Sequence, residues 1–332
     1  MPRIRSVATA LPPHRLDQPE AMEACRRALG DDRLLAVFKR SGVDTRYFAF
    51  PPEYYLNGHT FAERNRDYIE QAVALGERAI RDALAKADAG PRDIDQFFFV
   101  TTTGLATPSV DARLAHRLGM RADVCRNPLF GIGCAGGAAA IARSSRVRGR
   151  SLVLSVELCG QTFRNRDRSP ENYVGAALFG DGAAAIVIDE GPGIEIVASS
   201  SELFPGTEGV MGWDFVDDGL KLVLTKDVPK VIERDVAPAV DRFLAGHDLT
   251  RAHVDHFILH PGGRRVLETY RSRLGVSAAK LKPARECLRA VGNLSSAAVL
   301  FVLASIRAKS GDVGLMAAVG PGFAVELVLL RW

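Results

Sequence analysis

Short apolar runs alternate with segments of helical spacing over the whole chain, and this alternation constrains the fold more than any other feature. The apolar runs are typical of buried strands and lie at residues 95–103, 151–158, 183–189, 194–203, 256–260, 314–320 and 324–332. Helical spacing occupies residues 17–41, 60–89, 109–118, 228–245 and 264–274 and also follows residues 134 and 292. Strands that alternate with helices predict an α/β fold in which helices cover the sheets.

The order of elements restarts near residue 190, which predicts two halves of similar build, residues 1–190 and 191–332. A chain of 332 residues is long enough for two such halves, and its 47% hydrophobic content is enough for a large core. No low-complexity linker separates the halves. We therefore expect them to pack together as one globule.

Charge, cysteine content and hydropathy exclude several classes of protein. The net charge is only +4 and the basic residues are spread along the chain, which does not indicate nucleic-acid binding. No apolar run approaches the roughly 18 residues that a membrane span needs. The five cysteines form no CxxC pair, which indicates neither a disulfide scaffold nor a metal site. We expect free thiols and a cytoplasmic protein.

The sharpest local feature is the segment GIGCAGGAAAIARSSRV, which contains Cys134. An apolar run and two glycines precede this cysteine, and a helix rich in Ala and Gly follows it. Cys134 should then lie in the first turn of a buried helix, where the helix dipole and free N–H groups favour a thiolate. The alternative is a small core residue, because free cysteines are usually buried and inert.

Two polar residues of the second half suggest a reaction for this thiol. His260 ends the apolar run HFILH, and α/β folds bind ligands at the carboxyl ends of strands. Asn293 precedes a strongly apolar helix. Cys134 can take an acyl group from a thioester, after which His260 and Asn293 can donate hydrogen bonds to an enolate oxygen formed by decarboxylation. The alternatives are a core position for His260 and an N-cap for Asn293.

Seven segments, in order along the chain, together resemble the chalcone synthase family, the type III polyketide synthases. They are GIGCAGGAAAIARSSRV, SVELCGQTF, ALFGDGAAA, TKDVP, HPGGRRVLE, GNLSSAAVLFVL and VGPGF. The resemblance implies a duplicated αβαβα thiolase fold and a homodimer. It also implies iterative decarboxylative condensation of malonyl-CoA onto an acyl-CoA starter, and cyclisation to an aromatic or pyrone product. Coenzyme A thioesters would be substrates, and no cofactor or metal is implied.

The resemblance implies roles for individual residues. Cys134 corresponds to the family's nucleophile, and His260 and Asn293 correspond to its decarboxylation and oxyanion pair. Phe179 corresponds to the gatekeeper between the coenzyme A tunnel and the cavity. The positions that fall where the family lines its cavity are Thr103, Thr162, Gly212, Leu222 and Ser295. Arg33 and Arg40 fall near the basic residues that hold the coenzyme A phosphates, although both also fit a solvated basic helix.

Leu222 stands where plant chalcone synthases usually carry a second cavity Phe, so the resemblance points to the bacterial branch. A channel near Cys159 and Gly160 would favour medium or long acyl-CoA starters over coumaroyl-CoA, because each buried methylene contributes about 0.8 kcal/mol. A short cavity with malonyl-CoA as the starter is the alternative.

The alternatives are another enzyme of the same fold or a protein without catalytic activity. An initiation-type ketoacyl synthase would carry an HQAN-like segment where this chain has HPGG. Hydroxymethylglutaryl-CoA synthase needs an acidic group near the cysteine, and none stands out in the sequence. A catalytically silent scaffold is disfavoured by the intact set of Cys134, His260 and Asn293.

Overall fold

A nine-stranded mixed sheet runs through the computed structural model, which describes residues 1–332. Its strands occur in the order β11-β12-β13-β8-β1-β7-β6-β4-β5. Their bounds are β1 Arg3–Ala10, β4 Gln96–Val100, β5 Cys125–Leu129, β6 Ser151–Leu158, β7 Asp181–Asp189, β8 Ile194–Leu203, β11 His256–Leu259, β12 Val313–Gly320 and β13 Ala324–Arg331. The seven apolar runs of the sequence thus form seven of these nine strands, as predicted, and β1 and β5 are the other two.

The strand order repeats itself in the two parts of this sheet. In the first part β1 and β7, and β7 and β6, are antiparallel, whereas β6 and β4 are parallel. In the second part β8, β13, β12 and β11 follow the same order and the same directions, and only a counterpart of β5 is missing. The two parts join where β1 pairs with β8. The predicted α/β fold with a duplicated architecture is confirmed, while the division at residue 190 stays a prediction.

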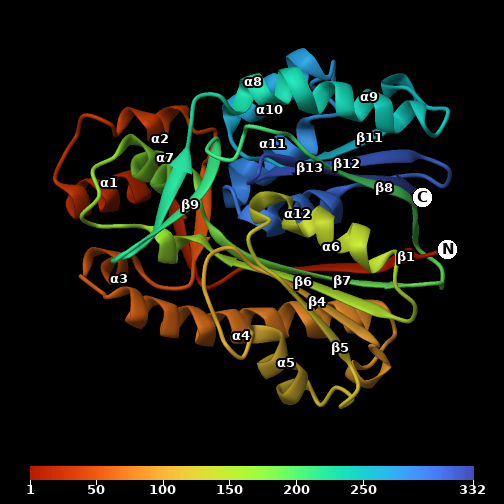
Figure 1. The fold of residues 1–332 in the computed structure, drawn as a ribbon. Coiled ribbons are helices and arrows are strands. Elements are labelled where there is room, and N and C mark those ends of the chain that lie inside the picture. The colour runs from red at the N-terminus through yellow and green to blue at the C-terminus, as the bar shows by residue number, and fades with distance from the viewer.

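Helices cover both parts of the sheet and fill the space between them, which gives five layers (Figure 1). One outer layer holds α4 (Phe61–Lys86) and α5 (Val110–Leu118). The central layer holds α6 (Gly136–Ser144) and α12 (Ala298–Ser305). The opposite outer layer holds α8 Val228–Val231, α9 Ala237–Ala245, α10 Arg264–Arg273 and α11 Lys282–Val291.

The central helices α6 and α12 are buried on nearly all sides, which explains why neither has a polar face. Glycine lets them approach closely. A Cβ atom on Gly137 would lie 2.3 Å from the carbonyl oxygen of Ser296, at the start of α12, and one on Gly136 would lie 2.5 Å from a methyl carbon of Val100. The Gly-Gly pair after Cys134 therefore sets the distance between the two helices.

Smaller elements gather at one end of the layers, on the left of Figure 1. They are the helices α1 Gln18–Leu29, α2 Ala36–Arg40, α3 Pro52–Leu56 and α7 Pro170–Leu178, the pair β2 His14–Asp17 with β3 Thr45–Phe48, and the hairpin of β9 Met211–Val216 with β10 Gly219–Leu224. The single helix predicted over residues 17–41 is wrong. It is split into α1 and α2, because Gly30 ends α1 in the left-handed conformation at φ 65°.

None of the helices combines the length and the hydropathy that a membrane crossing needs.

Candidate active site

Cys134 lies on an elbow between β5 and α6. It sits in a 3-10 turn, Gly133–Ala135, that leads directly into the helix. Gly133 has φ +55°, and a Cβ atom there would lie only 2.4 Å from the ring of Pro321. The elbow thus needs glycine at this position both for its backbone conformation and for its space.

A second elbow, at the start of α12, faces the first. Ser295 has φ +48° and begins the 3-10 turn Ser295–Ala297. Its hydroxyl oxygen lies 3.6 Å from the Sγ atom of Cys134. The duplicated fold therefore brings the starts of its two central helices together at the sulfur.

Asn293 is fixed by hydrogen bonds on both sides of its amide. Its Oδ1 atom accepts from the backbone N–H of Ser295 at 2.8 Å and so fixes the turn before α12, whereas the N-cap position that the sequence offered for Asn293 is taken by Leu294. Its Nδ2 atom donates to the carbonyl oxygen of Gly262 at 3.2 Å. An amide nitrogen carries two hydrogens, so one N–H of Asn293 is left for another acceptor.

His260 follows β11 directly and is 2% exposed. Its Nδ1 atom is buried and has no hydrogen-bond partner. Burial lowers the pKa of His260 to about 4, so the imidazole is neutral near pH 7.

The predicted thiolate is wrong for the resting site. Burial raises the pKa of Cys134 to about 12, and the hydrogen bond from Ser295 offsets only part of that rise. Desolvation of the sulfur thus outweighs the helix N-terminus from which the thiolate was predicted. At rest, a neutral thiol and a neutral imidazole therefore lie in the same site.

One chamber brings most of the predicted residues together. Cys134, His260 and Asn293 line it, and we call it the Cys134 chamber. The other predicted residues in its wall are Phe179, Gly212, Leu222 and Ser295.

A second cavity, the apolar chamber, adjoins the first. Phe179, Trp213 and Leu222 line both cavities, while Thr162 lines only the apolar one. Trp213 of β9 pairs across the hairpin with Leu222 of β10, and its ring centroid lies 6.1 Å from that of Phe179. These three side chains form the boundary between the chambers. Cys159 and Gly160, the predicted channel residues, also line the apolar chamber.

Three of the predicted site residues lie outside both chambers. Thr103 is buried, and its hydroxyl donates to a carboxylate oxygen of Glu157 at 2.8 Å. Arg33 is at the surface, where it forms an ion pair with Asp31 at 2.6 Å. Arg40 is exposed on α2.

Sequence reasoning missed two residues of the site. Trp213 lies on a hairpin whose only signal was the Asp-Asp-Gly turn between its strands. Glu157 lies in a strand that is buried throughout, and no acidic group near the cysteine had been expected. It accepts from the backbone N–H of Thr102 at 3.1 Å, from Thr103 and from the hydroxyl of Ser296, next to Ser295. Burial raises the pKa of Glu157 to about 7.

Comparison with known proteins supports this description over the whole chain. Residues 5–192 match the N-terminal domain of chalcone and stilbene synthases, and residues 195–332 match the C-terminal domain of the same family. The chain is 40% identical to a 1,3,6,8-tetrahydroxynaphthalene synthase of Streptomyces peucetius, over 99% of this chain and 93% of that protein. It is 30% identical to a phloroglucinol synthase of Pseudomonas fluorescens, over 97% of this chain and 96% of that protein.

A solved structure agrees. The crystal structure of 1,3,6,8-tetrahydroxynaphthalene synthase from Streptomyces coelicolor, described as a bacterial type III polyketide synthase, superposes with a TM-score of 0.94 at 30% identity and covers 99% of each chain. The assignment rests on three findings. Two elbows meet at a cysteine, the strand order repeats, and both halves of the chain match domains of one family. The chain belongs to the chalcone and stilbene synthase family, the type III polyketide synthases.

Proposed function

We propose that Cys134 takes the acyl group of a coenzyme A thioester, extends it with malonyl units by decarboxylative condensation, and releases a cyclised product. One observation carries the proposal. Cys134 of the first half and His260 and Asn293 of the second half line a single chamber. The relatives support it, because they include a 1,3,6,8-tetrahydroxynaphthalene synthase and a phloroglucinol synthase.

Loading begins with a proton transfer in this proposal. The neutral imidazole of His260 takes the proton of the Cys134 thiol, and the thiolate sulfur attacks the thioester carbonyl carbon. The carbon–sulfur bond to coenzyme A breaks, and its thiolate leaves with the proton returned by His260. An ion pair of Cys134 and His260 is costly in a dry chamber, so we expect it to form only with substrate in place.

Asn293 and His260 stabilise the extender step. Loss of carbon dioxide from a malonyl group leaves an enolate oxygen, and the free N–H of Asn293 is positioned by Ser295 and Gly262 to donate to it. The enolate carbon then attacks the acyl carbonyl on Cys134, the carbon–sulfur bond to Cys134 breaks, and the Cys134 thiolate leaves while the lengthened chain stays on coenzyme A. Because the Asn293 amide cannot protonate the carbanion, the carbanion remains available as the nucleophile.

We propose that the apolar chamber holds the starter and the growing chain. Phe179 and Leu222 separate it from the Cys134 chamber, and Thr162, Gly212 and Ser295 contribute polar or small positions to the walls. Thirteen of the 18 residues that line the apolar chamber are hydrophobic, which supports a medium or long acyl starter over coumaroyl-CoA.

For the coenzyme A phosphates we propose Arg40, with Arg33 in a lesser role. A Cβ atom on Gly42, two residues after Arg40, would lie 3.5 Å from the Cβ atom of Arg264, which begins α10 just after the His260 loop. Arg33 is engaged by Asp31 instead. The backbone next to Arg40 thus lies beside the start of α10, which follows His260 in the chain.

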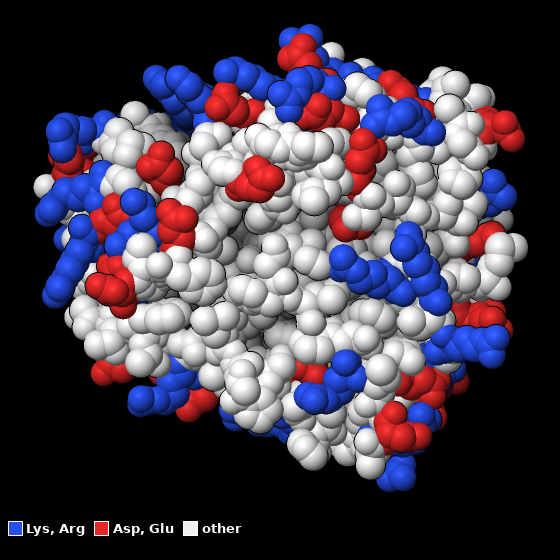
Figure 2. Space-filling view, viewed as in Figure 1, with Lys and Arg blue, Asp and Glu red and all other residues white.

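We also propose a homodimer. Figure 2 shows that the middle of one face is almost free of charged side chains and is hollowed. Phe130 and Phe215, which are 45% and 59% exposed, lie 6.4 Å apart between ring centroids, and Phe130 follows the exposed edge strand β5. A second copy that covers this edge would bury an apolar surface close to Cys134. The five free cysteines support a cytoplasmic location, where disulfides are rare.

The test is the mass of the intact protein after incubation with an acyl-CoA. Wild type should gain one acyl group, and Cys134→Ala should gain none and form no product. Cys125→Ala is the matched control and should load like wild type. A silent scaffold would show no adduct on any variant, and a ketoacyl synthase would load the acyl group but extend it only with a malonyl group on an acyl carrier protein, not with malonyl-CoA.

Asn293→Ala separates loading from decarboxylation. Loss of one oxyanion donor typically lowers the rate on the order of a hundredfold or more. The variant should therefore acquire the acyl group but release carbon dioxide from malonyl-CoA slowly. Failed loading with intact decarboxylation would leave Asn293 with only its turn-capping role.

A further inference from the structure

The β9–β10 hairpin forms part of the wall of the Cys134 chamber, yet few polar contacts join it to the rest of the protein. Its two strands pair only with each other. Asp218, in the turn at its tip, is the only residue of the hairpin, residues 211–224, that forms a hydrogen bond or an ion pair with another part of the chain. The position of the hairpin thus depends on apolar packing and on the contacts of Asp218.

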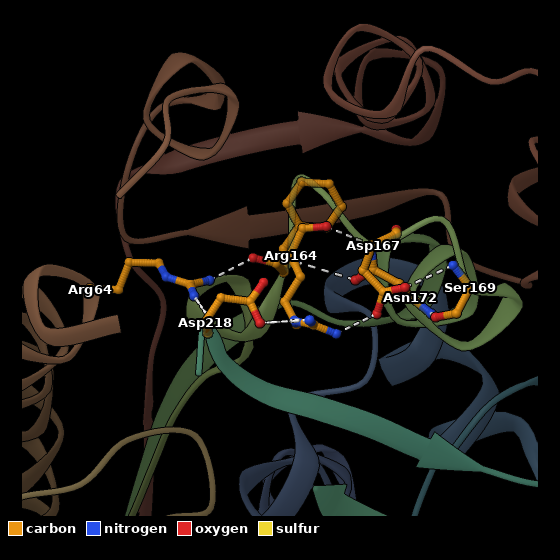
Figure 3. A network of polar contacts seen from close by, with 7 residues as sticks. Arg64, Arg164, Asp167, Ser169, Asn172 and Asp218 are labelled. Atoms are coloured by element: carbon orange, nitrogen blue, oxygen red, sulfur yellow. Dashed lines mark hydrogen bonds and ion pairs between the residues drawn. The ribbon is translucent and has the colours of Figure 1, made fainter. Parts of the chain in front are cut away.

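Two arginines of the first half hold this tip (Figure 3). Arg164 donates to the Asp218 carboxylate from Nε at 2.9 Å and from Nη2 at 2.6 Å. Arg64, on α4, donates from Nη2 to the backbone carbonyl oxygen of Asp218. A Cβ atom on Gly219 would lie 2.9 Å from the same Nη2 atom, so the turn packs directly on Arg64. Both the backbone and the side chain of Asp218 are therefore held.

The two arginines are themselves fixed on the wall of the apolar chamber. Nη1 of Arg164 donates to the Asp167 carboxylate at 2.6 Å, and its backbone N–H and carbonyl oxygen pair with the side-chain amide of Asn172 at 3.3 and 2.9 Å. Nη1 of Arg64 donates to the carbonyl oxygen of Phe163 at 2.7 Å. Phe163 and Asn172 line the apolar chamber. The arginines thus attach the tip of the hairpin to the wall of that chamber.

The boundary between the two chambers lies part-way along the hairpin. Trp213 and Leu222 pair with each other, three residue pairs before Val216 and Gly219, the last pair before the turn. At about 3.3 Å for each residue, they lie roughly 10 Å from the tip. A displacement of the tip would therefore move Trp213 and Leu222 relative to Phe179, the third side chain of the boundary.

We propose that Arg164 and Asp218 are positioning residues that determine which starters enter the apolar chamber. Their ion pair holds the hairpin against the chamber wall and keeps the boundary side chains close together, so that a narrow acyl chain passes and a wide one does not. This rests on the proposed function, in which the starter lies in the apolar chamber. The side chains of Arg164 and Asp218 are 14% and 47% exposed, so salt should weaken the pair and loosen the boundary.

The first experiment measures the hairpin without catalysis. The chain has two tryptophans, so Trp213 is the only one in a Trp332→Phe parent protein. Asp218→Asn and Arg164→Gln should each raise the quenching constant of Trp213 fluorescence by acrylamide, a neutral probe. About 1 M NaCl, at which the Debye length is about 3 Å, should raise it in the parent protein too. Equal quenching in the parent and in both variants would overturn the proposal.

Asp241→Asn is the matched control. It removes a carboxylate that pairs with Arg251 at 2.6 Å on the outer helix α9, and it should quench like the parent protein.

The second experiment compares octanoyl-CoA with 4-phenylbutanoyl-CoA, which differ in width more than in length. Asp218→Asn should raise the ratio of kcat/KM for the wide over the narrow starter about fivefold, as a partly exposed ion pair allows. Salt should raise this ratio in wild type but not in Asp218→Asn, which has no ion pair left to screen. Asp218→Glu keeps the carboxylate and should return the ratio toward the wild-type value, and Asp241→Asn should keep that value.

A merely structural role would lower kcat/KM for both starters alike. An unchanged ratio in Asp218→Asn would therefore overturn the proposal, even where quenching of Trp213 rises. If no acyl-CoA loads on the wild-type protein, the proposed function fails, whereas loading with an unchanged ratio overturns only the role of Arg164 and Asp218.

Discussion

Among single residues, Glu157 links the segments of the Cys134 chamber through its carboxyl group. It holds the loop after β4, through Thr102 and Thr103, and the start of α12, through Ser296. Its pKa rises from 4.5 to about 7 in the folded protein because of burial. The folded state thus binds this proton more tightly than the unfolded state, so the free energy of unfolding falls as pH rises from about 4.5 to about 7.

We predict that Glu157→Gln removes this contribution. The glutamine oxygen can accept from Thr102 and Thr103, and its amide can donate to the Ser296 hydroxyl, without a charge to desolvate. Urea unfolding at pH 5 and pH 8 should show a smaller loss of stability for the variant, by up to about 3 kcal/mol. The surface variant Glu208→Gln should follow wild type. If the free energy of unfolding falls by the same amount between pH 5 and pH 8 in Glu157→Gln and in wild type, the Glu157 carboxyl titrates normally.

For single residues, the sequence was sufficient to select the candidate site residues but not to predict their protonation states. Cys134, His260 and Asn293 were found because each follows or precedes a buried element at a recognisable motif. The charge state of Cys134 was missed because desolvation depends on atoms from several segments, whereas the helix N-terminus is visible locally. Thr103 was predicted to line the cavity but lies behind it, bonded to Glu157.

Among the elements, the contact between α6 and α12 sets the position of both elbows. We predict that Gly137→Ala destabilises the protein although alanine favours helices, because its Cβ would lie 2.3 Å from a backbone oxygen that cannot move freely. Overpacking of this kind costs about 1–3 kcal/mol. Gly209→Ala, at a site with no atom within 4 Å, is the control and should change stability little in thermal unfolding. Equal melting temperatures of Gly137→Ala and wild type would show that α6 and α12 can move apart to admit the methyl group.

The β9–β10 hairpin carries two of the three side chains between the chambers. We predict that Trp213→Ala widens this boundary and shifts the ratio of kcat/KM toward bulkier starters, by about tenfold for one well-placed group. Asp214→Ala, exposed on the same strand, should keep the wild-type ratio. If Trp213→Ala and Asp214→Ala both keep the wild-type ratio of kcat/KM, the side chains between the two chambers do not select the starter.

The core strands and helices could be predicted because their apolar periodicity is strong, and IEIVASSSEL matches β8 residue for residue. The hairpin could not, because β9 and β10 pair only with each other and lie half-buried, which leaves little alternation to detect. The structure also shows that Gly160→Phe would be a poor test of the predicted channel near Gly160. A Cβ atom on Gly160 would already lie 2.8 Å from the Tyr55 hydroxyl, so that substitution would disturb the wall as well as fill it.

For the whole molecule, Cys125 on the free edge of β5 can report on assembly. It is exposed in the single chain. If a second copy covers this edge, alkylation of Cys125 should slow as protein concentration rises through the range in which sedimentation shows dimer formation. Cys25, which is buried in the single chain, should react slowly throughout. Dimers with an unprotected Cys125 would place the interface elsewhere.

The duplicated architecture has a consequence for the protein during its synthesis on the ribosome. Cys134 leaves the ribosome well before His260 and Asn293 are made, and the helix that presses on its elbow, α12, comes near the end of the chain. A growing chain thus carries the proposed nucleophile without the groups that give it a reaction. Translation products truncated before His260 would hold the sulfur but lack both partner groups, so they could not carry out the proposed condensation.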